Sequence, residues 1–290
     1  MFSGSITKGN SGLVSIYSGK AHEGVAGNIK IHVGETTKGP GGNLEFTAGS
    51  TLATINPSWR PHETVGGEIE MRTGKSSSGP SGSMRIITEE GGRYAGSGNV
   101  TINTGSSNAG NSGHVAIDTG ESFDGRGGNI EMFVGQGSKG RGGDVLVSSG
   151  HGYEEGGTVR ILGGSGHRNG LQYSGNGGHI DLIGGEAVGD RGARKDKEKY
   201  DKGGMINLQG GSSKRSTGGD VAITSGRSEA TTRDGKSGDV KVMTGDASKT
   251  RGLSGDIEVK TGEASDGKSG NIWVHTGDSD SNGGGERLVI

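Results

Sequence analysis

The residues of this chain best suited to ligand chemistry form a regular Asn/Asp series. In nine copies of a recurring unit, an Asn or Asp residue directly follows the first glycine: Asn28, Asn43, Asn99, Asn129, Asp144, Asp220, Asp239, Asp256 and Asn271. Carboxylates in successive units could bind a cation, whereas the alternative is that Asx side chains bond the local backbone at a corner. In calcium-binding glycine repeats the Asp lies two residues before the apolar position, but Asp144 directly precedes Val145. We therefore expect a structural ladder, with no metal and no cofactor.

Catalytic constellations are hard to find. The absence of cysteine excludes a thiol nucleophile, a disulfide and a Cys-ligated metal. The eight histidines show no paired spacing, and Gly-x-Gly fragments carry no weight in a chain with 66 glycines. We expect that the chain is not an enzyme. A polysaccharide-active enzyme and an ice-binding protein are minor alternatives; the second would need a regular outward row of threonines, and the outward positions are mixed.

The elements that position these residues come from one repeat, Gly-x-h-x-h-x-x-Gly, where h is apolar. It recurs sixteen times, from Gly12 to Gly270, and eight of the fifteen spacings are 15 residues. Alternation of h and x predicts a strand with both apolar side chains on one face. We predict an all-β fold over residues 1–290, a single elongated parallel β-solenoid with about 15 residues per coil and about 17 coils.

Roles within the predicted coil follow when the opening glycine is counted as position 0. Glycine at position 7 predicts a positive φ at a corner, and threonine at position 6 could bond the backbone there. The small residues of the second half should face the apolar pair across a thin core. Opposite charges at position 3 of neighbouring coils predict pairs: Lys30–Glu45, Glu70–Arg85, Arg160–Asp181 and Lys241–Glu258.

Insertions fall at 50–66, 165–177 and 186–203, always between a position 7 glycine and the next opening glycine. Insertions that share one place in a repeat are expected to project from one face. Trp59 could stack on a sugar or a partner protein, or it could fold over the local coil. The third insertion carries a mixed-sign charged run, which we interpret as a solvated loop. The candidate ligand residues in these loops are Trp59, Arg60, His62, Arg168 and Tyr173.

Two surfaces could bind further copies of the chain. Apolar residues at outward positions form a lateral contact if they are contiguous and are scattered exposed residues otherwise: Phe133, Leu146, Leu162 and Ile183. The last residues, Leu288, Val289 and Ile290, begin a further coil without a cap. We expect them to pair head to tail with another copy, or with flanking domains of a longer chain.

Charge and hydropathy exclude several partners. The net charge is −2, with 31 basic and 33 acidic residues interspersed, which gives no electrostatic footprint for nucleic acid. No apolar run approaches the length of a membrane span. The first residues, Met1 to Gly4, do not form a signal peptide, which is compatible with a segment of a longer precursor.

The motif Thr-Gly-x-Ser-x-x-Gly-x-x-Gly-x-h-x-h covers Thr119–Met132 and, with Ala264 at the serine position, Thr261–Val274. It resembles the glycine-rich tandem repeats of secreted surface and matrix proteins of microalgae, over nearly the whole chain. The resemblance implies an extracellular structural or adhesive role, and the sequon Asn99-Val100-Thr101 is compatible with secretion. We expect a β-solenoid filament subunit or rigid spacer at the cell surface. The alternative is an adhesin or glycan-binding module that binds a glycan or matrix protein through the inserted loops.

Overall fold

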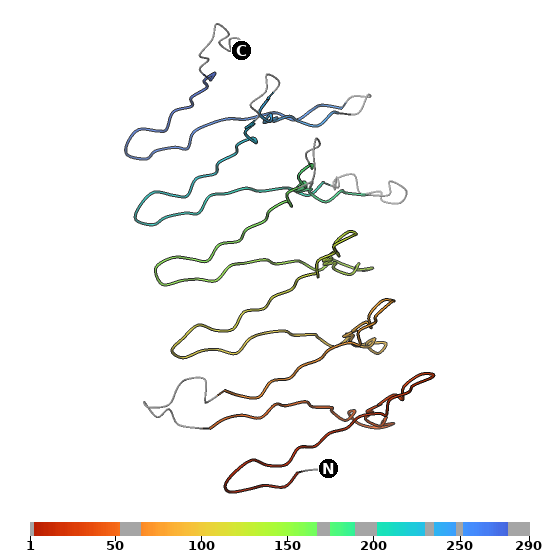
Figure 1. Ribbon diagram of the computed structural model, residues 1–290. Helices are drawn as coiled ribbons and strands as arrows, with labels where there is room; N and C mark the ends of the chain where they lie inside the picture. Colours follow the sequence, from red (N-terminus) through yellow and green to blue (C-terminus); the bar gives the residue numbers. More distant parts are fainter. Residues whose placement is uncertain are drawn as a thin grey trace. The chain divides into compact units, whose positions relative to one another are not determined.

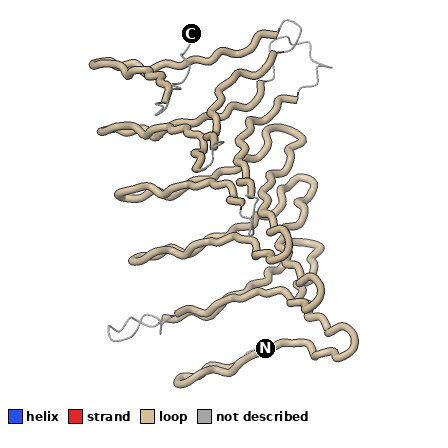
Figure 2. The backbone as a smooth tube through the Cα atoms, turned by 45° about the horizontal axis from the view of Figure 1, so that its top comes forward, coloured by secondary structure: helices blue, strands red, loops and turns tan. Residues whose placement is uncertain are grey.

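The computed structural model describes residues 3–52, 65–166, 175–188, 202–229, 235–247 and 252–277. These residues contain no helix and no strand, and Figure 2 draws the described backbone entirely as loop. The prediction of an all-β parallel solenoid is therefore wrong, because the sheet that defines such a fold is missing from the described part of the chain.

The backbone hydrogen bonds of the described residues explain the lack of strands. Seven of them join the N–H of an opening glycine to the C=O of the preceding position 7 glycine, over 2.8–3.0 Å. Each of these bonds closes the neck of one loop. A β-ladder needs such bonds to recur along two extended runs, and no continuation is present between the described runs.

The composition gives the energetic reason. Ordering the backbone costs roughly 1–2 kcal/mol per residue, and glycine loses the most conformational freedom of any residue. The chain has 66 glycines and is only 26% hydrophobic. Two apolar residues per repeat therefore bury too little surface to offset the ordering of about fifteen residues into stacked coils.

The chain divides into two segments, Met1–Phe133 and Val134–Ile290. Within each, extended runs alternate with loops at which the backbone changes direction, as the coloured trace of Figure 1 shows. The extended runs hold positions 1 to 6 of each repeat, and the loops hold the residues between position 7 and the next opening glycine.

Contacts between residues two apart show that the runs are locally extended. Positions 3 and 5 of the same repeat contact one another in four repeats: Glu45–Thr47, Glu70–Arg72, Glu258–Lys260 and Trp273–His275. Side chains at i and i+2 share a face only in extended backbone, so the predicted alternation is confirmed at this local level.

The same contacts correct the predicted charge pairs between coils. Glu70 pairs with Arg72 rather than Arg85, and Glu258 pairs with Lys260, 2.9 Å away, rather than Lys241. Every ion pair among the described residues joins side chains two or three positions apart. Without stacked coils, a charged side chain finds its partner within three residues along the chain.

Each loop that the structure describes in full contains a bend, and its chemistry is local. Ser76 Oγ accepts hydrogen bonds from the N–H groups of Ser78, at 3.4 Å, and Gly79, at 2.9 Å. Ser213 does the same for Arg215 and Ser216. Both serines lie six residues before an opening glycine and cap a three-residue bend, as serine hydroxyls do in turns. The recurrent small residues of the second half therefore form bends, and the prediction that they line a thin core is wrong.

Five of the six positive φ angles among the described glycines occur in these bends. The sixth, +73° at Gly4, lies eight residues before Gly12, as the position 7 glycine Gly19 lies before Gly27. Gly9, Gly24, Gly39, Gly140 and Gly267 have φ between +94° and +147°, and each lies three residues before an opening glycine. None of the fifteen glycines at position 7 has such an angle. The predicted location was wrong because the chain reverses inside the loop, where the absence of a Cβ permits this backbone.

Position 6 of each repeat lies close to the next opening glycine. A Cβ on Gly42 would lie 2.7 Å from Val33 Cγ1, and one on Gly143 would lie 2.8 Å from Val134 Cγ1. At these two positions an opening residue larger than glycine would meet the preceding position 6 side chain. At Thr104 and Thr119 the hydroxyl also donates to the carbonyl of the next opening glycine, over 3.3 and 3.4 Å, which confirms for these two threonines the predicted bond to the backbone.

No described residue is buried. The chain exposes 31,498 Å², whereas a folded monomer of 29.2 kDa is expected to expose about 11,000 Å². Seven described residues are partly covered, and six of them are at position 6: Ala48, Thr88, Ser149, Gly184, Gly210 and Thr261. The partial burial in the described residues therefore comes from local loop closure rather than from a shared core.

Candidate interaction surface

The two apolar residues of each repeat form one surface, which we call the apolar face. The side chains at position 2 are 44–62% exposed, and those at position 4 are 59–76% exposed. All sixteen repeats follow this pattern, from Val14 and Ile16 to Ile272 and Val274. The repeat thus places paired branched and aliphatic side chains at regular intervals, and the chain itself leaves more than two-fifths of each exposed.

Glycine and serine explain why the apolar face stays exposed. The loops that follow each run are made of small residues, which present little apolar surface to cover it. In six repeats the residue at position 6 is partly covered, and it lies against the next opening glycine.

Positions 1, 3 and 5 form the opposite surface, the polar face. It carries the nine Asn and Asp residues of the predicted ladder, which are all exposed. Asp144 pairs with Arg141 at 2.8 Å and Asp239 with Lys236 at 3.1 Å, each time with a base three residues earlier in the loop. Exposed pairs of this kind contribute less than about 1 kcal/mol. Within the described residues, no group of three or more His, Asp or Glu lies together as metal ligands would.

The predicted lateral contact also lies on the polar face. Phe133, Leu146, Leu162 and Ile183 are at positions 5, 3, 5 and 5, and each is 72–88% exposed. Phe133 ends the first segment, while the other three belong to the second. Their association with another chain stays a prediction.

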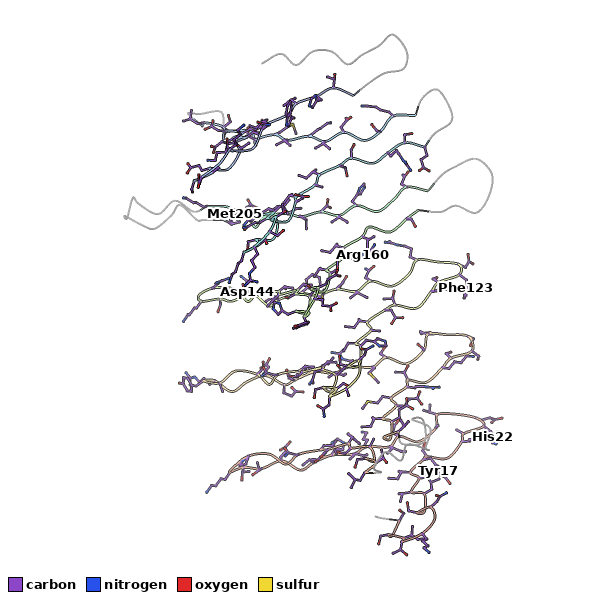
Figure 3. All side chains as sticks on the ribbon, turned by 90° about the vertical axis from the view of Figure 1, so that its left-hand side faces the viewer. Tyr17, His22, Phe123, Asp144, Arg160 and Met205 are labelled. Carbon is purple, nitrogen blue, oxygen red and sulfur yellow. The ribbon has the colours of Figure 1, made fainter. Side chains whose placement is uncertain are left out.

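The remaining candidates lie outside the described residues. They are the loop residues Trp59, Arg60, His62, Arg168 and Tyr173, and the end residues Leu288, Val289 and Ile290. The loops that the structure does describe present other aromatic side chains. Figure 3 shows His22 and Phe123 at turns of the chain, pointing outward, and both lie five residues before an opening glycine.

One aromatic pair stands on the polar face without having been singled out as a site from the sequence. Trp273 and His275 stack with ring centroids 5.8 Å apart and planes 15° apart. Trp273 is 73% exposed. Their spacing of two residues in an extended run was the signal that could have found them, because positions 3 and 5 face the same way.

The apolar and aromatic side chains described above are exposed. The described residues include no helix that is both long and apolar enough to cross a membrane. Comparisons with protein-family models, with curated proteins and with solved structures gave no match.

Proposed function

We propose that this chain is an extracellular structural repeat protein that associates with copies of itself through the apolar face. The observation that carries the proposal is the half-exposed apolar pair in all sixteen repeats. Burying a side chain such as Val, Ile or Leu fully contributes about 1.5–3 kcal/mol. A side chain that is still half exposed retains about half of this, so each pair holds roughly 1.5–3 kcal/mol that association could release.

A second copy is the partner that fits this surface. Another copy presents the same apolar pairs at the same spacing, so many pairs can be buried at once. Association itself costs several kcal/mol in lost motion, and the copies must therefore engage several repeats together. The net charge of −2 leaves little repulsion between copies.

The extracellular part of the proposal is supported by the resemblance of Thr119–Met132 to secreted matrix repeats and by the exposed sequon at Asn99. Assembly end to end, through Leu288 to Ile290, stays part of the proposal as one possible geometry.

The test is a concentration series followed by light scattering and electron microscopy. The variant replaces the apolar pairs of two neighbouring repeats, Val115, Ile117, Ile130 and Met132, with serine. We expect the concentration for half-maximal association to rise at least tenfold, because about 1.4 kcal/mol of lost burial corresponds to a factor of ten.

The matched control replaces exposed hydrophobic residues outside the apolar face. Phe123, 98% exposed, and Tyr153 lie in loops, and Phe123→Ser with Tyr153→Ser should leave association within about twofold. A third variant, Phe133→Ser with Leu146→Ser, tests the lateral contact on the polar face. A chain that remains monomeric at all concentrations, or equal effects of the apolar-face and control variants, would refute the proposal.

Glycan binding is the second candidate, and the Trp273–His275 stack favours it. An indole whose conformation is restricted by stacking on a neighbouring ring can stack on the apolar face of a sugar at low entropic cost. The chain has two tryptophans, so Trp59→Phe leaves Trp273 as the sole indole fluorophore. Titration with a neutral β-linked glucan oligosaccharide should then change its fluorescence, and Trp273→Ala with Trp59 retained should abolish retention on the immobilised glucan. Retention unchanged in that variant would exclude this site.

A further inference from the structure

We infer that Asn99 is an acceptor for N-linked glycosylation. The triplet Asn99-Val100-Thr101 matches the acceptor sequence Asn-x-Ser/Thr. The other triplet with the same outer residues, Asn56-Pro57-Ser58, has proline in the middle, which excludes it. Asn99 is thus the single acceptor position in the sequence. The inference rests on the proposed function in one respect, since the chain must enter the secretory compartment to be modified.

The local backbone favours modification. Asn99 and Thr101 are positions 1 and 3 of an extended run, so their side chains lie on the same face. Side chains two residues apart on this face contact one another elsewhere in the chain, as at Glu45–Thr47, 2.9 Å, and Trp273–His275. The Thr101 hydroxyl is therefore placed where it can reach the Asn99 carboxamide.

Access to the acceptor is open. Asn99, Val100 and Thr101 are all exposed, and the run that holds them is neither helix nor strand. A glycosylating enzyme must bind the acceptor in an extended form, and here it would have no secondary structure to unfold. The turn before the run, closed by Ala95 N–H to Gly92 C=O at 3.0 Å, ends three residues before the opening glycine Gly98.

The reaction transfers an oligosaccharide from a lipid-pyrophosphate donor, catalysed by a membrane-bound oligosaccharyltransferase. Asn99 Nδ2 forms a bond to the anomeric carbon of the first sugar. The bond between that carbon and the pyrophosphate oxygen breaks, Nδ2 loses one proton, and the lipid pyrophosphate leaves. No oxidant or reductant is needed, and the product is an N-glycosidic carboxamide.

The position of the glycan also bears on association. Asn99 belongs to the polar face, while Val100 and Ile102 belong to the apolar face on the other side of the same run. A bulky, hydrated glycan at Asn99 would cover the polar face of this repeat and leave its apolar pair free. Modification and self-association through the apolar face are therefore compatible.

The experiment translates the full chain, preceded by a cleavable secretion signal, in the presence of endoplasmic-reticulum microsomes. The readout is a gel shift that is removed by peptide N-glycosidase, which also converts the modified asparagine to aspartate and so locates it by mass spectrometry. We expect one glycan, at Asn99. Thr101→Ser should retain it and Thr101→Ala should lose it. Asn103→Gln is the matched control, because Asn103 lies on the same face outside the sequon, and it should retain the glycan.

The outcome is separable from that of the proposed function. Protection from added protease shows that the chain has been translocated. If the translocated chain is not glycosylated while a control acceptor protein in the same reaction is, the inference is overturned and the proposed self-association is unaffected. A glycan that persists in Thr101→Ala would also overturn it. Conversely, if the apolar-face variant associates like the unmodified sequence, the proposed function fails while the acceptor assignment stands.

Discussion

Replacing Gly210 with alanine should open one loop neck, and replacing its neighbour Gly211 should not. Gly210 is at position 6 of its repeat, where most other repeats carry Thr, Ser, Ala or Val and two carry glycine, Gly163 and Gly184. A Cβ on Gly210 would lie 2.1 Å from the carbonyl oxygen of Gly219, the next opening glycine. A Cβ on Gly211 would have no atom within 4 Å. The two variants differ by one position and add the same methyl group.

The expected effect follows from these distances. Carbon and oxygen approach to about 3.3 Å, so the Gly210→Ala methyl and the Gly219 carbonyl must move apart by roughly 1.2 Å. The same movement carries Gly219 N–H away from Gly211 C=O, now 2.8 Å apart, to roughly 4 Å, beyond hydrogen-bonding distance. The lost bond contributes a net free energy of about 0.5–1.5 kcal/mol, equivalent to about a 2- to 13-fold change in the ratio of closed to open loop.

Amide hydrogen exchange of Gly219, followed by NMR, measures this ratio. In Gly210→Ala the exchange rate should rise by about 2- to 13-fold after correction for the intrinsic rate. In Gly211→Ala it should stay the same or fall, because alanine also restricts the open chain, which favours closure by about 0.4–1 kcal/mol where the backbone is compatible. Equal exchange rates in the two variants would show that the contact between Gly210 and Gly219 does not govern closure, and the steric reasoning would be wrong.

Three further changes test the loops and the charged residues. Gly24→Ala places a Cβ at φ +109° and should open the bend at a cost of roughly 1–2 kcal/mol, seen as a changed backbone coupling constant at residue 24, whereas Gly19→Ala should leave that constant unchanged. Ser76→Ala removes the acceptor of the Gly79 N–H bond and should speed exchange of that amide by about 2- to 13-fold; an unchanged rate would mean that the serine does not cap the bend. Glu70→Gln removes an exposed ion pair and should shift the self-association constant by less than about twofold in light scattering; a tenfold shift would place the polar face in the contact.

The local features of the chain follow from its sequence, because they depend on residues a few positions apart. The alternation of faces is an example: Trp273 and His275 lie on one face since any extended run places i and i+2 together. The bond from Thr119 to Gly128 likewise joins two ends of one short loop. Both could be predicted without knowing how the repeats are arranged.

The arrangement of the repeats could not be derived in the same way. Whether Lys30 meets Glu45 depends on the balance between burial and backbone ordering over the whole chain, and periodicity does not report that balance. The glycine-rich loops raise the entropic cost of ordering the backbone, which disfavours stacking of the repeats. The position of the positive φ angles failed for a related reason: both Gly34 and Gly39 are glycine, and only the path of the loop determines which of them adopts the left-handed region.

For the candidate surface, too, the sequence correctly predicts which residues share a face but not whether they are buried. The sequence identifies the apolar pairs, such as Ile130 and Met132, as residues that share a face. It predicts them to be buried within one chain, and they are exposed. The pattern therefore establishes which side chains act together, and the structure establishes that the chain itself does not cover them.

The seven loops closed by a glycine–glycine hydrogen bond have necks of nearly the same length, whatever number of residues they enclose. Gly82 bonds to Gly74 over 3.0 Å, and Gly204 bonds to Gly185 over 2.8 Å. By the logarithmic dependence of closure entropy on length, the longer excursion costs only about 0.8 kcal/mol more. A gene encoding such a chain can therefore gain or lose codons between two necks without disturbing the neighbouring repeats. For the same reason, an engineered peptide grafted between Gly185 and Gly204 should be carried as readily as the residues now there.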